Sequence, residues 1–317
     1  MRAVAVAKPA GEPQLMRLPV PEPGPGEVLI KVVAAGLNPL DWKLADRARR
    51  GETADEAVYP LIYGVDFAGK VAALGPGVTR FAEGDPVFGQ PKRVPVGAYG
   101  TYAEYVIAAE DGVLAAAPES LPLPLAAALP TAGLTAMSML DAAGLVAGQT
   151  LLLVGAAGGV GSFVTQLAAA HDVRVVAVTR GVGEHEMGEL GAADTVDARS
   201  GLPVDELREA YPEGVDALID LASDPERFAA YAELVADGGV AVSTIGAADP
   251  DALARRGVEG VNFVVSPSAE LLARLAAEVD AGRATVRLGA QVPLADAPDA
   301  VARSRAGKAR GKTVILV

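Results

Sequence analysis

The stretch LLLVGAAGGVG, residues Leu151 to Gly161, decides the fold. An apolar segment from Thr150 to Val154 has the composition of a buried strand and runs into a glycine-rich turn, after which Ser162 to Ala169 has a helical pattern. A strand, a glycine-rich turn and a helix start follow in the order that a dinucleotide-binding site requires, although such turns also occur for purely structural reasons. The turn reads Ala-x-Gly-x-x-Gly, with Ala156 where the first glycine is usual.

Each part of this turn has a physical role. Gly158 lets the backbone approach a pyrophosphate, and Gly161 permits close packing of the helix on the strand. The helix N-terminus supplies unpaired N–H groups and a partial positive charge. A nucleoside-triphosphate site is disfavoured because no Lys-Ser or Lys-Thr pair follows the glycines. We therefore expect dinucleotide contacts from Ala156, Gly158, Gly159, Val160 and Gly161.

The next apolar segment, Val173 to Val178, ends in Thr179-Arg180-Gly181. An NAD site usually carries Asp or Glu here, about 20 residues beyond the glycines, to hold the ribose hydroxyls. Arg180 can instead offer its guanidinium to the 2′-phosphate of NADP, and Thr179 can hydrogen-bond the same phosphate. The sequence thus predicts NADPH as cofactor, the alternative being an exposed loop arginine. A basic run near the end of the chain could approach the same phosphate: Lys308, Arg310 and Lys312.

The chain shows two patterns. Up to about Pro118, short β segments separated by Gly and Pro favour an all-β, barrel-like unit. From about Leu121, helical stretches alternate with apolar strands, which predicts an α/β fold with a doubly wound parallel sheet. Here we expect a helix from Pro225 to Leu234 that closes at Gly238, and another with its N-cap at Ser266. The expected domains cover residues 1–120, 121–264 and 265–317, the last returning to the first.

Composition restricts the function. Of 317 residues, 51% are hydrophobic, but no apolar run reaches the roughly 20 residues of a membrane span. The start of the chain meets Lys8 too early for a secretory signal, so we expect a cytoplasmic protein. A net charge of -13 opposes binding to nucleic acid or anionic membranes. The absence of cysteine excludes thiolate zinc sites, and His171 and His185 are too isolated to form a metal site.

Five further stretches carry a family resemblance. They are AAGLNPLDWK (34–43), GVDFAGKV (64–71), VTRFAEGDPVFG (78–89), LPTAGLTA (129–136) and GKTVIL (311–316). With the glycine turn, they make the chain resemble the zinc-free quinone reductases and enoyl reductases of the medium-chain dehydrogenase/reductase superfamily, over nearly its whole length. The resemblance implies a GroES-like β-barrel domain, an inserted Rossmann domain, and a C-terminal return to the first domain.

The resemblance also implies that no metal is bound. Zinc members of the superfamily hold a catalytic metal through Cys, His and Cys, and the matched motifs place these positions at Asn38, Val65 and Thr131. An amide, a valine and a hydroxyl do not form the ligand set that zinc prefers. The loop from Gln90 to Gly97 stands where those members carry a four-cysteine lobe. Without a Lewis acid, hydride delivery to an electrophilic quinone or enone is favoured over alcohol oxidation.

In such a family the nicotinamide would lie in a cleft between the domains. Asn38 is then the first candidate for a hydrogen bond to the substrate oxygen or the cofactor, although Asn before Pro is also a common turn former. Thr131 is expected at the carboxamide end of the cofactor, and Thr244, Ile245 and Gly246 along the same cleft. Tyr63 is a candidate proton donor. Trp42, Tyr63 and Phe263 are candidates for the walls of a flat substrate site. For each of them, ordinary packing in the core is the alternative.

Other functions remain open at this point. A trans-acting enoyl reductase of polyketide or fatty-acid synthesis would share the Asn-Pro-x-Asp-Trp-Lys segment, and a nonenzymatic NADPH-binding protein could use the same fold. A short-chain dehydrogenase is disfavoured because no Tyr-x-x-x-Lys occurs. We also expect a homodimer, because the apolar segment from Gly260 to Val265 has the character of an unpaired edge strand.

Overall fold

The computed structural model describes residues 1–9, 11–52, 57–92, 95–309 and 311–317. Their chain groups into two compact units: Met1–Leu134 with Pro267–Gly282 and Val286–Val317, and Thr135–Ser266 with Arg283–Thr285. The domain limits expected from the sequence stay a prediction. Within the described ranges, no helix has both the length and the apolar character that crossing a membrane requires.

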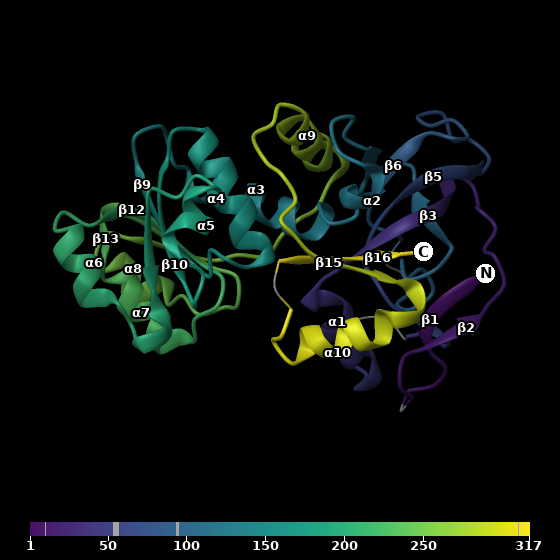
Figure 1. Cartoon of the computed structure of the whole chain (residues 1–317), viewed down its shortest axis with the longest axis horizontal. Coiled ribbons are helices and arrows are strands. Elements are labelled where there is room, and N and C mark those ends of the chain that lie inside the picture. Colours follow the sequence, from purple (N-terminus) through teal and green to yellow (C-terminus); the bar gives the residue numbers. More distant parts are fainter. Residues whose placement is uncertain (10, 53–56, 93–94, 310) are drawn as a thin grey trace. The chain divides into compact units, whose positions relative to one another are not determined.

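The second unit is built on a parallel sheet with the strand order β11-β10-β9-β12-β13-β14. Helix α4 packs on β9 and β10, and α7 packs on β12 and β13, on opposite faces of the sheet (Figure 1). The strands are β9 (Thr150–Val154), β10 (Arg174–Thr179), β11 (Asp194–Asp197), β12 (Val215–Asp220), β13 (Val235–Ser243) and β14 (Glu259–Asn262). The helical elements are α4 (Gly159–Ala170), α5 (Glu184–Gly188), η1 (Ala198–Ser200), α6 (Val204–Ala210), α7 (Pro225–Ala232) and α8 (Pro250–Ala254).

This arrangement confirms the predicted doubly wound sheet. The central strands are apolar on both faces, and Leu152, Val176 and Leu218 lie in one buried cluster with residues of the covering helices. A sheet buried on both faces needs such continuous apolar runs, which is why β9 reads Thr-Leu-Leu-Leu-Val.

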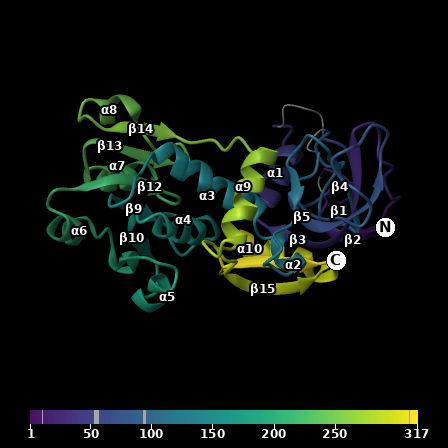
Figure 2. The same cartoon turned by 90° about the horizontal axis from the view of Figure 1, so that it is seen from above.

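The first unit contains two sheets, one with the order β2-β1-β4 and one with the order β15-β16-β3-β5-β6-β8, in which β7 also pairs with β3. Both chain ends lie in this unit (Figure 2), the N-terminus just before β1 and the C-terminus just after β16. The strands are β1 (Arg2–Val6), β2 (Gln14–Arg17), β3 (Glu27–Leu37), β4 (Leu61–Ile62), β5 (Asp66–Leu74), β6 (Pro86–Gly89), β7 (Tyr105–Ala109), β8 (Leu114–Ala116), β15 (Leu288–Pro293) and β16 (Lys312–Leu316).

Short helices accompany these sheets. They are α1 (Pro39–Arg49), α2 (Leu123–Ala126), α9 (Ala269–Asp280), η2 (Leu294–Asp296) and α10 (Ala297–Arg305), while α3 (Pro130–Ala143) begins in the first unit and continues in the second. Helix α1 starts directly after β3 because Asn38 is extended and Pro39 has a backbone angle suited to the first turn of a helix. The antiparallel pairing of β16 with β3 sets Val314 opposite Gly36 and brings the end of the chain beside the start of α1.

Two helix limits differ from the sequence-based expectation. Helix α7 ends at Ala232, and Gly238 lies inside β13, where its φ of 81° accompanies a shift of register against β12. Helix α9 has its N-cap at Ser268, two residues beyond Ser266, because the Ser268 hydroxyl accepts a hydrogen bond from the N–H of Leu271. Strand β11, a short segment with aspartate at both ends, was not expected from the sequence.

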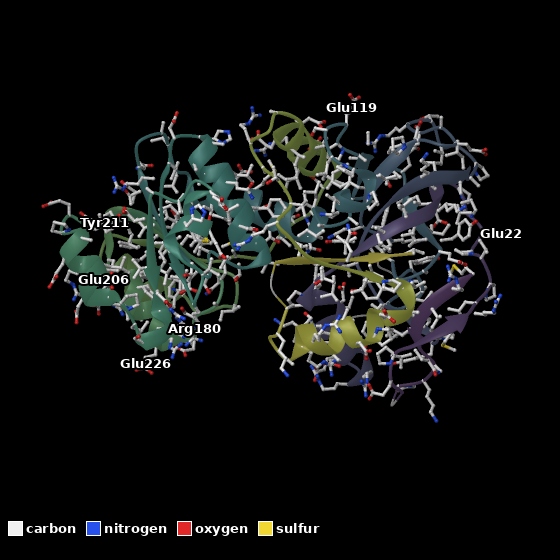
Figure 3. All side chains as sticks on the ribbon, viewed as in Figure 1. Glu22, Glu119, Arg180, Glu206, Tyr211 and Glu226 are labelled. Carbon is white, nitrogen blue, oxygen red and sulfur yellow. The ribbon has the colours of Figure 1, made fainter. Side chains whose placement is uncertain are left out.

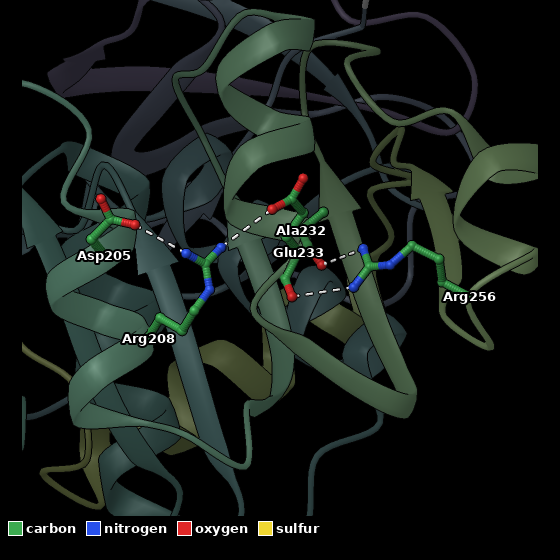
Figure 4. A network of polar contacts seen from close by, with 5 residues as sticks. All are labelled: Asp205, Arg208, Ala232, Glu233 and Arg256. Atoms are coloured by element: carbon green, nitrogen blue, oxygen red, sulfur yellow. Dashed lines mark hydrogen bonds and ion pairs between the residues drawn. The ribbon is translucent and has the colours of Figure 1, made fainter.

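Two arginines, Arg208 and Arg256, contact the C-terminal end of α7 (Figure 4). Arg256 donates to the carbonyl oxygens of Ala232 and Glu233, at 3.0 and 3.2 Å, and so satisfies acceptors that a helix end leaves unpaired. Arg208 of α6 pairs with Asp205 at 3.0 Å and with Glu233 at 3.3 Å. These ion pairs are exposed, so the capping of carbonyl groups is the larger contribution to stability.

Candidate functional site

The glycine turn of the second unit has the geometry of a phosphate-binding loop. Strand β9 ends at Val154, Gly155 takes a φ of 83°, and α4 begins at Gly159 with Gly158 as N-cap. A Cβ on Gly161 would lie only 2.4 Å from the carbonyl oxygen of Gly155, so the tight return of the chain requires glycine there. The first N–H groups of α4, a helix of 12 residues, are therefore presented beside the turn.

The turn lies where the order of the strands changes direction. From β9 the chain proceeds to β10 and β11 on one side of the sheet, and then to β12, β13 and β14 on the other. In open α/β sheets, ligands bind at the carboxyl ends of the strands beside such a switch point. The other predicted cofactor residues of this unit lie at the carboxyl ends of strands in the same sheet: Thr179 is the last residue of β10, Arg180 follows it, and Thr244, Ile245 and Gly246 follow β13.

The loop after β10 differs in one detail from the expectation. The buried hydroxyl of Thr179 donates its only proton to the carbonyl oxygen of Val182, at 2.7 Å, so a direct donation from Thr179 to a phosphate is not favoured. The side chain of Arg180 is exposed (Figure 3). Nearby, Asp197 accepts from the N–H of Gly181 and pairs with Arg199 at 2.6 Å, two residues that the sequence analysis did not single out.

The loop after β13 is held by hydrogen bonds at the same edge of the sheet. The N–H of Thr244 donates to the carbonyl oxygen of Asp220 at 3.2 Å, while Ser243 accepts from the backbone of Ile245 and Ala247. The side chain of Ile245 is 53% exposed, and Gly246 has a φ of 76°. This loop thus presents an apolar side chain at the carboxyl edge.

The first unit contains a buried polar network centred on Asp66, the first residue of β5. Its carboxylate accepts four hydrogen bonds: from Gln90 Nε2 at 3.1 Å and Thr131 Oγ1 at 2.7 Å on Oδ1, and from Asn38 Nδ2 at 2.8 Å and the Thr131 N–H at 2.9 Å on Oδ2. Four acceptances match the capacity of an ionised carboxylate. The network therefore fixes the hydroxyl of Thr131, a predicted cofactor residue.

Both the nitrogen and the oxygen of the Asn38 carboxamide form hydrogen bonds in this network. Its Nδ2 donates to Asp66 and, at 3.3 Å, to the carbonyl oxygen of Gly36, and its Oδ1 accepts from Lys312 Nζ at 2.6 Å. Asn38 is 3% exposed. Because both N–H bonds are directed at protein acceptors, this arrangement favours a positioning role for Asn38 over a hydrogen bond donated to substrate.

Lys312 is buried at the first position of β16, with a second contact to the carbonyl oxygen of Leu37 at 3.3 Å. Burial lowers the pKa of its ammonium group, while the carboxylates of Asp66 and Asp41 oppose that effect. The expectation that Lys312 could approach a cofactor phosphate is wrong, because its ammonium group is buried and hydrogen-bonded inside the first unit. Arg310 of the same basic run lies outside the described residues.

Asp41 extends the network to Tyr102. The carboxylate Oδ2 accepts from the N–H of Asn38 at 2.7 Å and from the Tyr102 hydroxyl at 2.8 Å, while Oδ1 is buried and finds no partner among the described residues. Burial, with a smaller contribution from the charge of Asp66, raises the pKa of Asp41 to about 7. Burial also raises the pKa of Tyr102 well above its ordinary value. Asp41 is therefore a buried carboxyl group that changes protonation near neutral pH.

The aromatic candidates lie mainly in cores. Tyr63 is 2% exposed and packs in a cluster with Tyr102, Trp42 and residues of α10. Burial raises the pKa of Tyr63, and the charges that act on it belong to Arg305, Asp46, Arg49 and Glu12 rather than to the Asp66 network. These observations do not favour Tyr63 as a proton donor. Phe263 is half-buried just after β14.

The donor set does not fit catalytic zinc. Asn38 turns its Oδ1 to an ammonium group, Val65 has no ligand atom, and the hydroxyl of Thr131 is directed at Asp66. No cluster of three metal-ligating His, Asp or Glu side chains exists among the residues that the structure describes. In the loop that replaces the four-cysteine lobe, residues 93 and 94 lie outside the described ranges.

Comparison with known proteins finds two family models that match separate parts of the chain. Residues 24–119 match the alcohol dehydrogenase GroES-like domain, and residues 190–315 match the family model described as zinc-binding dehydrogenase. The chain is 33% identical to a 2-methylene-furan-3-one reductase of Solanum lycopersicum, over 93% of this chain and 73% of the relative. It is 31% identical to a quinone oxidoreductase of Sus scrofa, over 100% of this chain and 98% of the relative. A mycobacterial protein solved as a complex with NADPH superposes with a TM-score of 0.82, at 28% identity and full coverage of both chains.

Proposed function

The chain belongs to the quinone oxidoreductase and enone reductase family of the medium-chain dehydrogenases/reductases, and from this membership we propose that it uses NADPH to reduce a quinone or an α,β-unsaturated carbonyl compound. The observation that carries the proposal is the glycine turn between β9 and α4, which lies at the switch point of the sheet, with exposed Arg180 after the neighbouring strand. An oxidoreductase dependent on NAD(P)H is the activity that the relatives share.

Arg180 supports NADPH over NADH. The end of β10 carries no carboxylate that would hold the ribose hydroxyls of NAD. A guanidinium there suits the 2′-phosphate, since its planar set of donors matches phosphate oxygens. The structural relative solved with NADPH agrees with this choice. The proposed contacts to the pyrophosphate come from the turn residues Ala156, Gly158, Gly159, Val160 and Gly161.

The donor set supports an electrophilic substrate. When bound, the reduced nicotinamide supplies a hydride, and a quinone or enone accepts it without a Lewis acid. Thr131 is the proposed contact at the carboxamide end of the cofactor, and Thr244, Ile245 and Gly246 line its path. Asn38 holds Asp66 and thereby Thr131, and Tyr63 contributes to the core beside them. Water serves as the proton source in this proposal, because burial raises the pKa of Tyr63 and of Tyr102, so that neither tyrosine is suited to proton donation near neutral pH.

We also propose a homodimer. Strand β14 is an edge strand in the parallel sheet, and Val264, two residues beyond it, is 85% exposed. An unpaired apolar edge favours pairing with a second copy. Light scattering at micromolar concentration should return twice the mass of the chain, and a monomer mass would count against the pairing.

A spectrophotometric screen of NADPH oxidation tests the function. Quinones, enones and acyl thioesters are offered in separate assays, with NADPH and with NADH. Turnover of quinones or enones with NADPH supports the proposal, while turnover confined to acyl thioesters would indicate an enoyl reductase of chain-building pathways. Binding of NADPH, seen by its fluorescence, without oxidation by any acceptor would indicate a nonenzymatic binding protein.

A further inference from the structure

We infer that Lys312 is a positioning residue that sets the direction of the Thr131 hydroxyl, acting through Asn38 and Asp66. The effect on cofactor binding rests on the proposed function, in which Thr131 contacts the nicotinamide end of NADPH. The chain of contacts itself lies within the first unit and is made of buried groups, except for half-buried Thr131 at its end.

The first step is the orientation of Asn38. An ammonium group has donors only, so Lys312 Nζ, 2.6 Å away, requires the carboxamide oxygen of Asn38 on its side. The Nδ2 group must then face the other way, where Asp66 accepts from it at 2.8 Å. If the carboxamide were reversed, its N–H groups would face the ammonium of Lys312 and its oxygen would face the carboxylate of Asp66, and both contacts would be repulsive. Lys312 and Asp66 thus fix the carboxamide from both ends.

The second step is the orientation of Thr131. Asp66 receives Asn38 and the Thr131 N–H on Oδ2, which leaves Oδ1 for Gln90 Nε2 and the Thr131 hydroxyl, 2.7 Å away. Because an ionised carboxylate only accepts, the hydroxyl proton of Thr131 points inward at Asp66. The same oxygen accepts from Gln90 Nε2 at 3.0 Å, so a ligand beside Thr131 meets a hydroxyl that acts as an acceptor, the polarity that an amide N–H donor requires.

The third step is the role of charge. Asp66 is fully buried, and the ammonium of Lys312 is the cation that the network itself contains. Without it, the Asp66 carboxylate is a buried charge with no compensating cation in the network, which is unfavourable. The Asn38 carboxamide also loses the donor that fixes its orientation, so Asp66 and the Thr131 hydroxyl bonded to it are no longer held in one arrangement. Loss of Lys312 should thus act at Thr131, although the two side chains share no contact.

A double-mutant cycle tests this coupling. Lys312→Met removes the ammonium group, Thr131→Val removes the hydroxyl, and the double variant combines them. Lys70→Met is the matched control, because it removes the same charge from an exposed position of the same unit. For each protein the Kd is measured for NADPH and for 2′,5′-ADP, which lacks the nicotinamide. Circular dichroism confirms folding.

Each single variant should raise the Kd for NADPH by about 2- to 12-fold, as expected for one neutral hydrogen bond. The double variant should be no weaker than the weaker single variant, because both changes remove the same contact. The Kd for 2′,5′-ADP should stay unchanged in all variants. Wild-type affinity for NADPH in Lys312→Met, or losses that multiply in the double variant, would overturn the inference.

Two further arms keep the inference separate from folding and from the proposed function. If Lys312→Met does not fold, Lys312→Gln replaces it, since glutamine removes the charge but keeps polar atoms, and the same non-additivity is expected. If the wild-type protein does not bind NADPH, the proposed function fails. The cycle is then measured in urea unfolding, where non-additive losses support the coupling of Lys312 to Thr131 and additive losses overturn it.

Discussion

Replacing Asp41 by asparagine should change how the stability of the first unit depends on pH. The pKa of Asp41 is raised from 3.8 to about 7 in the folded chain, chiefly by burial. Between these values the folded state holds a proton that the unfolded state has released. The free energy of unfolding therefore falls as the pH rises through this window, and the contribution is lost above about pH 7.

The size of the effect follows from the same two values. One proton corresponds to about 1.4 kcal/mol per pH unit, so an interval of about three pH units gives about 4 kcal/mol. Asparagine does not titrate, and its carboxamide oxygen can still accept from the Asn38 N–H and the Tyr102 hydroxyl. Its two N–H groups replace an oxygen without a partner among the described residues, which adds a cost that is constant with pH.

Urea unfolding followed by tryptophan fluorescence measures this difference. Trp42 is the single tryptophan and follows Asp41 directly in α1, so it reports on the first unit. Relative to the wild-type protein, Asp41→Asn should gain about 4 kcal/mol between about pH 4 and about pH 8. Asp205→Asn, at a side chain that is 95% exposed, is the control. Parallel stability curves for wild type and Asp41→Asn would refute the reasoning, because they would mean that the folded chain does not retain this proton.

Three further outcomes are expected. Arg180→Ala should raise the KM for NADPH by about 10- to 150-fold, the value of a hydrogen bond to a charged group, and leave NADH nearly unchanged; equal weakening of both cofactors in steady-state assays would argue against a phosphate contact. Gly161→Ala forces a Cβ to within 2.4 Å of the Gly155 carbonyl oxygen, so calorimetry should show a lower Tm and no NADPH binding, and wild-type affinity would contradict the tight turn. Metal analysis should find no stoichiometric zinc, and a chelator should leave turnover intact; loss of activity with the chelator would restore a metal to the mechanism.

Local patterns in the sequence predicted the second unit well. The strand from Thr150 to Val154, the glycine turn and the following helix are encoded by consecutive residues, and the structure has them within three residues of the expected limits. The family and the fold class were confirmed by the comparisons. Strand β11 escaped notice because its pairing with β10, rather than its own short polar sequence, makes it a strand. Gly238 was misread because a positive φ serves a bulged strand as well as a helix end.

The polar network of the first unit could not be read from the sequence in the same way. Asp41 and Asp66 lie inside the motifs that carry the family resemblance, so the residues were in view, but several of their hydrogen-bond partners are distant in the chain: Tyr102 lies 61 residues from Asp41, and Thr131 lies 65 residues from Asp66. Lys312 is 274 residues from Asn38, and only the pairing of β16 with β3 brings them together. Its place in a run of basic residues in the sequence made Lys312 read as a surface cation. Burial of charged groups follows from tertiary pairing, which no local pattern contains.

The measurement that tests the central claim most directly follows the transferred hydrogen. The protein is incubated with an enone and NADPH that carries deuterium at C4 of the nicotinamide, in separate samples for the two faces of the ring. The account predicts one-for-one oxidation of NADPH, with deuterium from one face bound to the β-carbon of the saturated product. It also predicts much slower turnover with NADH. NADPH that binds but is not oxidised by any enone or quinone, or a saturated product without deuterium from either face, would contradict the account.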